Sequence, residues 1–480
     1  MSLPDHKTKI VATIGPASES PEMLERLIRA GMNVARLNFS HGDFRGHADR
    51  IARIRAAATA TGQRVAIMAD LPGPKMRIGK LDPEPIGLLP GDRFVLTTED
   101  IVGNARRVSV SFERLPQVVK PGDRLFLNDG LVQLMVERAT GKDVECVVAV
   151  GGELRSRKGL NIPGIDLGIR AFTEHDRNCL EFALQHGVDA VSQSFVETAA
   201  DLTAVREAAA KSGRQPFLIA KIERSGALQH LDEILSASDG IMVARGDLGV
   251  EVPIQEMALI QKQLIARANL AGKPVITATQ MLESMVASRL PTRAEATDVA
   301  NAILDGTDCI MLSGESAMGK YPEEAVAMLA SIAAATEARR PPARLRDLRE
   351  LCRDHAPSTA AEAIAAVVEH ALDTVPCAAV FVPTHTGTTA RMISRFKPGA
   401  WITSLSRDPV VGQGLAFSYG VHPVDLVDEP DSWCDFARTW LREQQVSGTV
   451  AMLVAGPSKR NPDANHRIEF MRMGDRPNRT

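Results

Sequence analysis

Apolar runs of strand length alternate with amphipathic stretches over the first 70 residues. Residues 9–14, 33–39 and 65–69 form the apolar runs, and residues 23–30 and 48–60 between them carry the spacing of helices with one buried face. The order strand, helix, strand, helix, strand predicts a parallel sheet, because parallel neighbours need helical crossovers.

The pattern changes between residues 71 and 170, where Pro and Gly become frequent. Turn signals such as Pro90-Gly91-Asp92 and Pro121-Gly122-Asp123 separate short β-type runs, one of which is residues 144–150. Closely spaced short strands with Gly turns predict a small all-β domain. We expect it to be an insertion, because the alternation of strands and helices resumes after it.

The resumed alternation supplies five more strands, near residues 190–196, 217–222, 241–244, 275–279 and 309–312. Residues 254–270 and 292–304 have helical spacing between them. Three strands before the insertion and five after it make eight strand–helix units, which predict a closed (β/α)8 TIM barrel. An open, doubly wound sheet is the structural alternative.

A separate α/β domain is expected after the charged stretch 339–353, which is typical of a solvated helix or linker. It combines helices at 358–372 and 389–396 with strands at 378–382, near Val421 and near Val450. The sequence therefore predicts an α/β protein with this division of the chain: the barrel in residues 1–70 and 171–345, a small inserted all-β lid domain in 71–170, and a C-terminal α/β regulatory domain in 346–480.

Composition narrows the function classes. A net charge of −3 and only 4% aromatic residues argue against binding to nucleic acid. The six cysteines are scattered without a Cys-x-x-Cys motif, so reduced thiols are expected rather than disulfides or a zinc site. The N-terminus lacks the apolar core of a signal peptide, and no apolar run reaches the ~20 residues that span a bilayer. We expect a cytoplasmic protein that does not enter a membrane.

Lys221 and Glu223 stand at the end of the fifth expected barrel strand, in the run FLIAKIE (217–223). Alternate residues of a strand point to the same side, so both charges share one face of an apolar strand. Burying such a pair is costly unless both charges are compensated. A divalent metal on Glu223 and Asp247, with an anionic substrate beside Lys221, would compensate them. Such a site handles phosphates and developing oxyanions.

Other expected strands also end in polar residues: Arg36, Asn38 and Ser40 on one side of the second strand, Asp70 after the third, and Thr277 and Thr279 after the seventh. Any one of them could be a capping or turn residue. Catalytic groups of (β/α)8 barrels cluster at the carboxyl ends of the strands. Polar residues at several of these ends therefore favour an active site.

Six long stretches follow one another along the chain: TKIVATIGPAS (8–18), GMNVARLNFSHG (31–42), FLIAKIERSGAL (217–228), GIMVARGDLGVE (240–251), ATQMLESM (278–285) and PTRAEATDVANAILDGTDCIMLSGESAMG (291–319). In this order and at this spacing they resemble the pyruvate kinase family, closely over residues 7–345 and loosely beyond. The resemblance implies the glycolytic transfer of a phosphoryl group from phosphoenolpyruvate to ADP, giving pyruvate and ATP.

The resemblance also implies roles for single residues. Glu223 and Asp247 would hold Mg²⁺, with Mn²⁺ as an alternative, through hard carboxylate oxygens. Lys221 and the metal would stabilise the enolate that forms as the phosphoryl group leaves. Arg36 and Arg77 would contact the phosphoryl group, for which a guanidinium fork is well suited.

Further implied residues surround these. Backbone N–H groups of Arg245, Gly246 and Asp247 would bind the substrate carboxylate, and a water relay ending at Thr279 would protonate the enolate. Residues near ADP and its own Mg²⁺ would be Asn38, His41, Asp129 and Lys158, although Lys158 could also be an ordinary residue of a solvated loop. The inserted domain would close as a lid and exclude water.

A monovalent cation is implied for many members of the family, with ligands that correspond here to Asn38, Ser40, Asp70 and the Leu71 carbonyl. Those members carry a glutamate after the Gly-Pro of the next loop, whereas this chain has Lys75. Lys75 would replace K⁺, so we expect that K⁺ is not required. An exposed lysine without a role is the alternative.

The C-terminal domain contains a run that resembles the effector loop of the family: Thr384, His385, Thr386, Gly387, Thr388 and Thr389. Hydroxyls and N–H groups at a helix start form an anion site, so a phosphorylated metabolite is the expected effector. A plain Gly/Thr turn is the alternative. Lys459 and Arg460 could add contacts to phosphate. The resemblance further implies a homotetramer.

Two other functions fit part of this pattern. A metal-dependent lyase or aldolase on a similar barrel could use Lys221, Glu223 and Asp247 without any nucleotide. The inserted domain and the polar residues of the second and third strands argue against it. A catalytically inactive metabolite sensor is disfavoured, because every matched catalytic position is filled.

Overall fold

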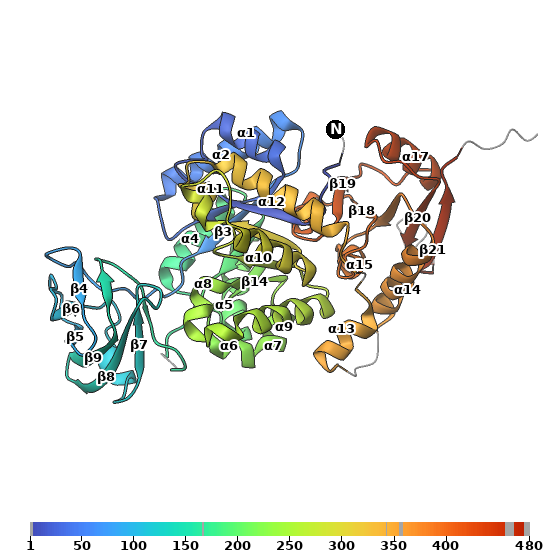
Figure 1. The fold of residues 1–480 in the computed structure, drawn as a ribbon. Helices are drawn as coiled ribbons and strands as arrows, with labels where there is room; N and C mark the ends of the chain where they lie inside the picture. The colour runs from blue at the N-terminus through green and yellow to red at the C-terminus, as the bar shows by residue number, and fades with distance from the viewer. Residues whose placement is uncertain (1–2, 166–167, 342, 355–358, 457–464, 475–480) are drawn as a thin grey trace, which may run out of the picture.

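The computed structural model describes residues 3–165, 168–341, 343–354, 359–456 and 465–474 (Figure 1). Eight parallel strands close into a barrel, which confirms the predicted fold and rules out the open sheet. They are β1 (Lys9–Thr13), β2 (Met32–Asn38), β3 (Ala66–Leu71), β12 (Ala190–Gln193), β13 (Phe217–Ile222), β14 (Gly240–Ala244), β15 (Val275–Ala278) and β16 (Cys309–Leu312). Pairing of β1 with β16 closes the ring.

The helices that cover the outside of the barrel are α1 (Pro21–Ala30), α2 (Phe44–Thr61), α4 (Glu174–Gln185), α5 (Ala199–Lys211), α7 (Leu231–Ala237), α9 (Met257–Leu270), α10 (Arg293–Leu304) and α12 (Pro322–Glu337). Further helical segments lie between strands and helices: α6 (Ser225–Gln229), α8 (Arg245–Glu251), η1 (Ile254–Glu256), η2 (Glu283–Val286) and α11 (Gly314–Ala317). Local signals fix the helix starts. Thr292, for example, caps α10 in a reciprocal capping box with Glu295.

The inserted segment forms a separate β-domain, which lies at one side of the barrel in Figure 1. Its elements are β4 (Ile86–Leu88), β5 (Arg93–Thr97), β6 (Arg107–Ser109), α3 (Leu115–Val118), β7 (Arg124–Leu127), β8 (Val132–Thr140), β9 (Asp143–Val150), β10 (Gly152–Leu154) and β11 (Leu160–Asn161). A six-stranded sheet encloses its own apolar core, which includes Phe94 and Leu134. We refer to this β-domain as the lid.

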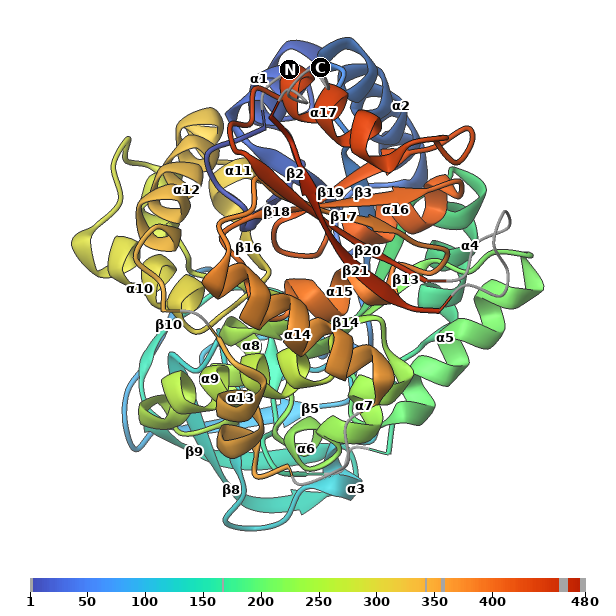
Figure 2. The ribbon, with the colours of Figure 1, turned by 90° about the vertical axis from the view of Figure 1, so that its right-hand side faces the viewer.

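The C-terminal part is an α/β domain with the strand order β19-β18-β17-β20-β21. Figure 2 shows it in front of the barrel. Its elements are α13 (Leu345–Cys352), α14 (Ala360–Thr374), β17 (Ala379–Pro383), α15 (Thr388–Ser394), β18 (Trp401–Ser406), α16 (Pro409–Leu415), β19 (Val421–Asp425), α17 (Trp433–Glu443), β20 (Val450–Ala455) and β21 (Arg467–Arg472). The sequence pattern missed strands β18 and β21.

The C-terminal domain closes the amino-terminal end of the barrel. Phe417 is fully buried and stacks on Phe217 at the start of β13, with ring centroids 5.2 Å apart. It belongs to the same apolar cluster as Met242 and Met311, which also face the cleft at the opposite end. The barrel interior is therefore a packed core from one end to the other.

All six cysteines lie within the described ranges and none forms a disulfide, as their scattered positions predicted. Over the same ranges, no helix is both long enough and apolar enough to span a bilayer.

Candidate active site

A cleft of about 120 Å³ opens at the carboxyl ends of the barrel strands. Its wall brings together most of the residues predicted for catalysis: Arg36, Asn38, Ser40, His41, Asp70, Lys75, Arg77, Lys221, Glu223, Asp247 and Thr279. They come from segments more than 200 residues apart, and the closed barrel places the ends of those segments on one rim.

Lys221 lies at the centre of a buried charge cluster. Its Nζ is 2.9 Å from Glu223 Oε1 and 3.3 Å from Asp70 Oδ1. Nζ also donates to Ser194 Oγ at 2.6 Å. Burial alone would lower the pKa of Lys221, but the two carboxylates raise it above its usual value. The residue is therefore a fixed ammonium and not a proton donor at neutral pH.

Arg36 and Asp70 form a second buried pair beside Lys221. Arg36 Nε and Nη2 both donate to Asp70 Oδ2, at 2.8 and 2.5 Å, and Nη1 donates to Thr13 Oγ1. Burial would raise the pKa of Asp70, but Lys221 and Arg36 hold it at about 2. Asp70 is thus a permanent anion that orients two cations toward the cleft.

Glu223 and Asp247 are suited to a divalent metal. Burial and the Asp247 charge together raise the pKa of Glu223, although Lys221 opposes the rise. Two carboxylates that repel each other at the edge of a cleft are a favourable donor set for a hard cation. Within the described ranges, no group of three or more His, Cys, Asp or Glu side chains could hold a metal. Glu223 and Asp247 would fill part of the coordination shell of such an ion, which leaves positions for substrate oxygens and water.

The start of α8 lies against the end of β15. Thr279 has a positive φ of 67°, accepts a hydrogen bond from the Gly246 N–H at 2.8 Å, and faces the cleft. The Arg245 side chain binds Asp298, at 2.7 Å, and the Thr279 carbonyl, and it does not line the cleft. Of the three N–H groups predicted to bind substrate carboxylate, that of Gly246 is thus already bonded.

Thr277 does not belong to the site, contrary to the alternation argument. It is fully buried, and its Oγ1 donates to Thr307 Oγ1 below the cleft. The strand ends at Ala278, and the positive φ of Thr279 breaks the two-residue alternation that the argument assumed.

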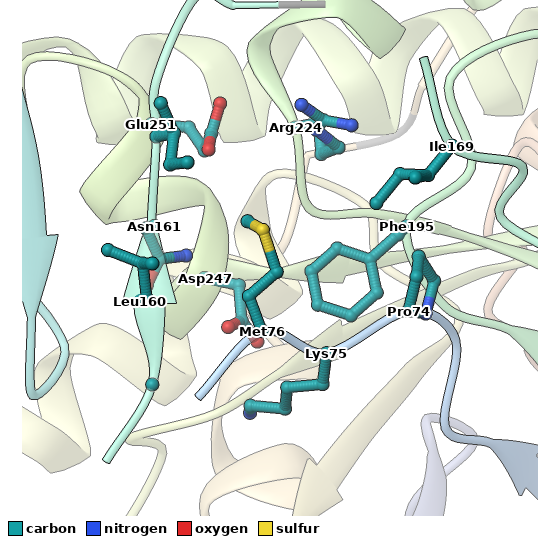
Figure 3. Close-up of a pocket in the computed structure, with 12 residues that line it drawn as sticks. Pro74, Lys75, Met76, Leu160, Asn161, Ile169, Phe195, Arg224, Asp247 and Glu251 are labelled. Atoms are coloured by element: carbon teal, nitrogen blue, oxygen red, sulfur yellow. The ribbon is translucent and has the colours of Figure 1, made fainter. Parts of the chain in front are cut away.

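Cations line the other side of the cleft. Lys75 and Arg77 lie near His41, where burial and then the charges of Arg77, Lys75 and Arg36 lower the pKa of the imidazole. Lys75 also lines a smaller hollow between barrel and lid, next to Met76 and Asp247 (Figure 3). Lys75 therefore lines both the cleft and the hollow, and its replacement of K⁺ stays a prediction.

Most of the predicted K⁺ ligands already accept hydrogen bonds from other protein groups. Asn38 Oδ1 accepts from the Ser40 N–H, and the Leu71 carbonyl accepts from Ser194 Oγ at 2.7 Å. Asp70 is bound to cations, as described above. Ser40 is exposed at the cleft wall.

The predicted nucleotide residues divide into two groups. Asn38 and His41 line the cleft, whereas Lys158 and Asp129 belong to the lid and stand outside its wall. The Lys158 carbonyl accepts from the Ile78 N–H at 2.9 Å. Asp129 is exposed in a tight loop with a φ of 56°. Lid and barrel would have to act together to bind one nucleotide with all four residues.

Sequence reasoning missed Ser192, Ser194 and Phe195. Ser192 Oγ donates to Asp70, Ser194 binds Lys221, and the Phe195 N–H donates to Glu223 Oε2 at 2.7 Å. Ser192 is the penultimate residue of β12, and Ser194 and Phe195 follow directly after the strand. The polar run Ser192-Gln193-Ser194 at a strand end was the signal that could have revealed them.

The predicted effector loop connects β17 to α15. Gly387 is fully enclosed with a φ of 78°, and its N–H donates to Thr384 Oγ1. Thr386 and Thr388 bond through their hydroxyls at 2.9 Å. His385 is exposed, and Thr389 is half-buried in the first turn of α15. Lys459 and Arg460 lie outside the described residues.

A cleft rich in fixed cations, with two carboxylates at its edge and at the catalytic end of a barrel, defines an enzyme that acts on anionic substrates. The pyruvate kinase barrel domain model matches residues 5–326, and the pyruvate kinase alpha/beta domain model matches residues 362–465. The chain belongs to the pyruvate kinase family and is a phosphotransferase.

Known pyruvate kinases are similar to this chain over most of its length. The chain is 52% identical over 425 residues to the pyruvate kinase of Thermococcus litoralis, covering 88% of this chain and 89% of that one. It is 44% identical to the pyruvate kinase of Geobacillus stearothermophilus, covering 90% and 74% respectively. A crystal structure of a pyruvate kinase from Cryptosporidium parvum superposes with a TM-score of 0.89 at 35% identity, covering 98% and 97%. Nothing in these comparisons supports a lyase or aldolase.

Proposed function

We propose that this enzyme transfers the phosphoryl group of phosphoenolpyruvate to ADP, giving pyruvate and ATP, in the cytoplasm. The observation that carries the proposal is the position of Lys221 between Asp70 and Glu223, with Arg36 bound to the same Asp70. This arrangement holds two cations where a trianionic substrate would place its charge.

Substrate binding follows from the cations on both sides of the cleft. Arg36 and Arg77 contact the phosphoryl oxygens, because guanidinium forks match them in shape. Backbone N–H groups at the start of α8, those of Arg245 and Asp247, receive the carboxylate in this proposal. Glu223 and Asp247 would hold Mg²⁺ or Mn²⁺, and the bound ion would supply positive charge that stabilises the anionic substrate.

Lys221 then stabilises the charge that develops on the substrate. As the phosphoryl group leaves, the enol oxygen becomes an enolate, and the ammonium is already oriented by Ser194 and Glu223. Such preorganisation avoids reorganisation during the reaction. Water linked to Thr279 delivers the proton to carbon, because the Thr279 hydroxyl itself is a weak acid.

The lid completes the nucleotide site. Asn38 and His41 approach ADP from the barrel, and Lys158 and Asp129 approach it from the lid. Closure of the lid excludes water from the phosphoryl group and thereby favours ADP as the acceptor.

Lys75 takes the place of K⁺. Its ammonium stands near His41 and Arg77, and Asn38, Asp70 and the Leu71 carbonyl already accept hydrogen bonds from the protein. A tethered cation keeps the rim positive at every turnover without an added ion.

The C-terminal loop 384–389 binds a phosphorylated metabolite, and the enzyme works as a homotetramer. Hydroxyls of Thr384, Thr386 and Thr388 are gathered at the start of α15, where an anion is favoured. Thermal-shift screening of sugar phosphates and nucleoside monophosphates tests the loop. A shift that Thr386→Val abolishes supports the site, and no response to any of them identifies it as a plain turn.

A coupled assay tests the proposed reaction. The purified protein should form ATP from phosphoenolpyruvate and ADP only when Mg²⁺ or Mn²⁺ is added. Pyruvate production that does not depend on ADP would contradict the proposal.

A further inference from the structure

The chain passes from barrel to lid through residues 72–77 and leaves the lid after β11, and Arg224 binds the described start of this return crossing, residues 162–165. Arg224 follows Glu223 directly, and its side chain is only 9% exposed. Its Nη2 donates to the Ile165 carbonyl at 3.1 Å, and its Nη1 lies 3.1 Å from Glu197 Oε2. One guanidinium thus links the end of β13, the loop after β12 and the return crossing.

The partners of Arg224 connect it to both halves of the site. The Ile165 side chain packs against the apolar core of the lid. Glu197 lies two residues after Phe195, whose N–H donates to Glu223. The Glu197 side chain is one-third exposed, and a Cβ at Gly226 would stand 2.3 Å from its Oε1, so any side chain at position 226 would displace the carboxylate from Arg224.

Arg224 also lines the hollow between lid and barrel. In Figure 3 its side chain lies between those of Glu251 and Ile169, above Met76 and Phe195. Burial raises the pKa of Glu251, and the Arg224 charge opposes that rise. The guanidinium thus lies between two carboxylates of the barrel, while its remaining hydrogen bond is made to the lid crossing.

We infer that Arg224 is a positioning residue that fixes the return crossing of the lid to the carboxyl end of β13, so that the lid closes in the correct place over the cleft. A buried guanidinium bonded to a carbonyl and a carboxylate has a fixed orientation. Displacement of reacting groups by about 1 Å can cost roughly 10²-fold in rate. The inference rests on the proposed function, because lid closure matters only if the lid supplies Lys158 and Asp129 to a nucleotide.

Arg224→Met removes both contacts while keeping an apolar side chain in the hollow. Arg206→Met is the matched control, because Arg206 also binds one carbonyl, that of Ala237, and one carboxylate, that of Asp239, but on the barrel away from the lid. We expect Arg224→Met to lower kcat at least tenfold and to raise the KM for ADP at least fivefold. Its Kd for phosphoenolpyruvate, measured without nucleotide, should stay within twofold, and the control should change none of these values.

Amide hydrogen exchange gives a readout that does not depend on turnover. Residues 160–165 should exchange faster in Arg224→Met than in the parent or in Arg206→Met, and Arg224→Lys should recover part of the protection and of kcat. A folded Arg224→Met with unchanged exchange, kcat and KM for ADP would overturn the inference, as would an equal loss of phosphoenolpyruvate binding. If the parent forms no ATP, the proposed function fails, while the exchange data still decide whether Arg224 holds the crossing.

Discussion

Lys221 is the residue on which the site depends most, because both neighbouring carboxylates are bound to it. Lys221→Met should lower kcat by about 10²–10³-fold or more, since removal of one preorganised electrostatic group has this effect. Circular dichroism should show an intact fold, because Arg36 still compensates Asp70. A kcat within tenfold of the parent would contradict the assignment.

Lys9→Met is the control for loss of a buried lysine. Lys9 lies at the other end of the barrel, where Nζ donates to the Val421 carbonyl at 2.8 Å. Its loss should lower the free energy of unfolding but leave kcat of the folded enzyme within a fewfold of the parent.

We predict that Lys75 makes the enzyme independent of K⁺. At matched ionic strength, the rate should change less than about tenfold, or roughly 1.4 kcal/mol of barrier, when K⁺ replaces Na⁺ or tetramethylammonium. Lys75→Glu should acquire a K⁺ requirement, because it removes the tethered cation. Lys80→Glu, at an exposed position in the lid, is the control and should not acquire a K⁺ requirement. A parent enzyme that depends strongly on K⁺ would show that Lys75 does not replace the ion.

Alternation along single strands was enough to place Lys221 with Glu223, and Arg36 with Asn38, on one face. Other site residues, such as Arg77 and Lys158, came only from the family resemblance. The partners of Arg224 could not be predicted in this way, although Arg224 itself stands in the recognised motif 217–228. Its partners Glu197 and Ile165 are brought to it only by barrel closure and the lid crossing.

At the scale of elements, strongly periodic segments were predictable, and strands of mixed polarity were not. All eight barrel strands were identified, because buried parallel strands are continuous apolar runs. β18 was missed because Thr403, Ser404 and Ser406 interrupt its apolar pattern, although all three are buried. β21 was missed because it is an exposed edge strand whose pairing with β20 spans a long connection.

β19 carries a histidine that should make the stability of the C-terminal domain depend on pH. Burial, with the charges of Lys9 and Arg64, lowers the pKa of His422 to about 4, against ~6.5 in the unfolded chain. Between these two values the unfolded state binds more protons, so stability should fall as the pH decreases from about 6.5 to 4. Over that interval the free energy of unfolding should fall less in His422→Phe than in the parent, by on the order of 2 kcal/mol, because the Phe ring does not titrate.

Denaturation followed by tryptophan fluorescence measures this effect, since all three Trp residues lie in the C-terminal domain. The Phe ring can keep the edge contact that His422 makes with Trp401, at a centroid distance of 6.5 Å. The exposed His186→Phe is the control, and its pH profile should match the parent. Identical profiles for His422→Phe and the parent would show that His422 does not cause the dependence of stability on pH.

At the scale of the whole molecule, the barrel exposes several large apolar side chains, among them Ile254, Leu259, Leu290 and Met318. Exposed apolar surface of this kind favours association between copies of the chain. Closed twofold symmetry is the common outcome, and the proposed tetramer would need two kinds of twofold interface, one between barrels and one between C-terminal domains.

Light scattering at micromolar concentration should therefore give four times the chain mass of 51.7 kDa. Leu290→Glu should reduce the assembly to dimers, because a charge at a barrel interface would be buried without a partner. Leu89→Glu introduces the same change at a side chain of similar exposure, 69% against 67%, but on the lid, and should remain tetrameric. A parent protein with the mass of a single chain would refute the tetramer, and a tetrameric Leu290→Glu would place the barrel interface elsewhere.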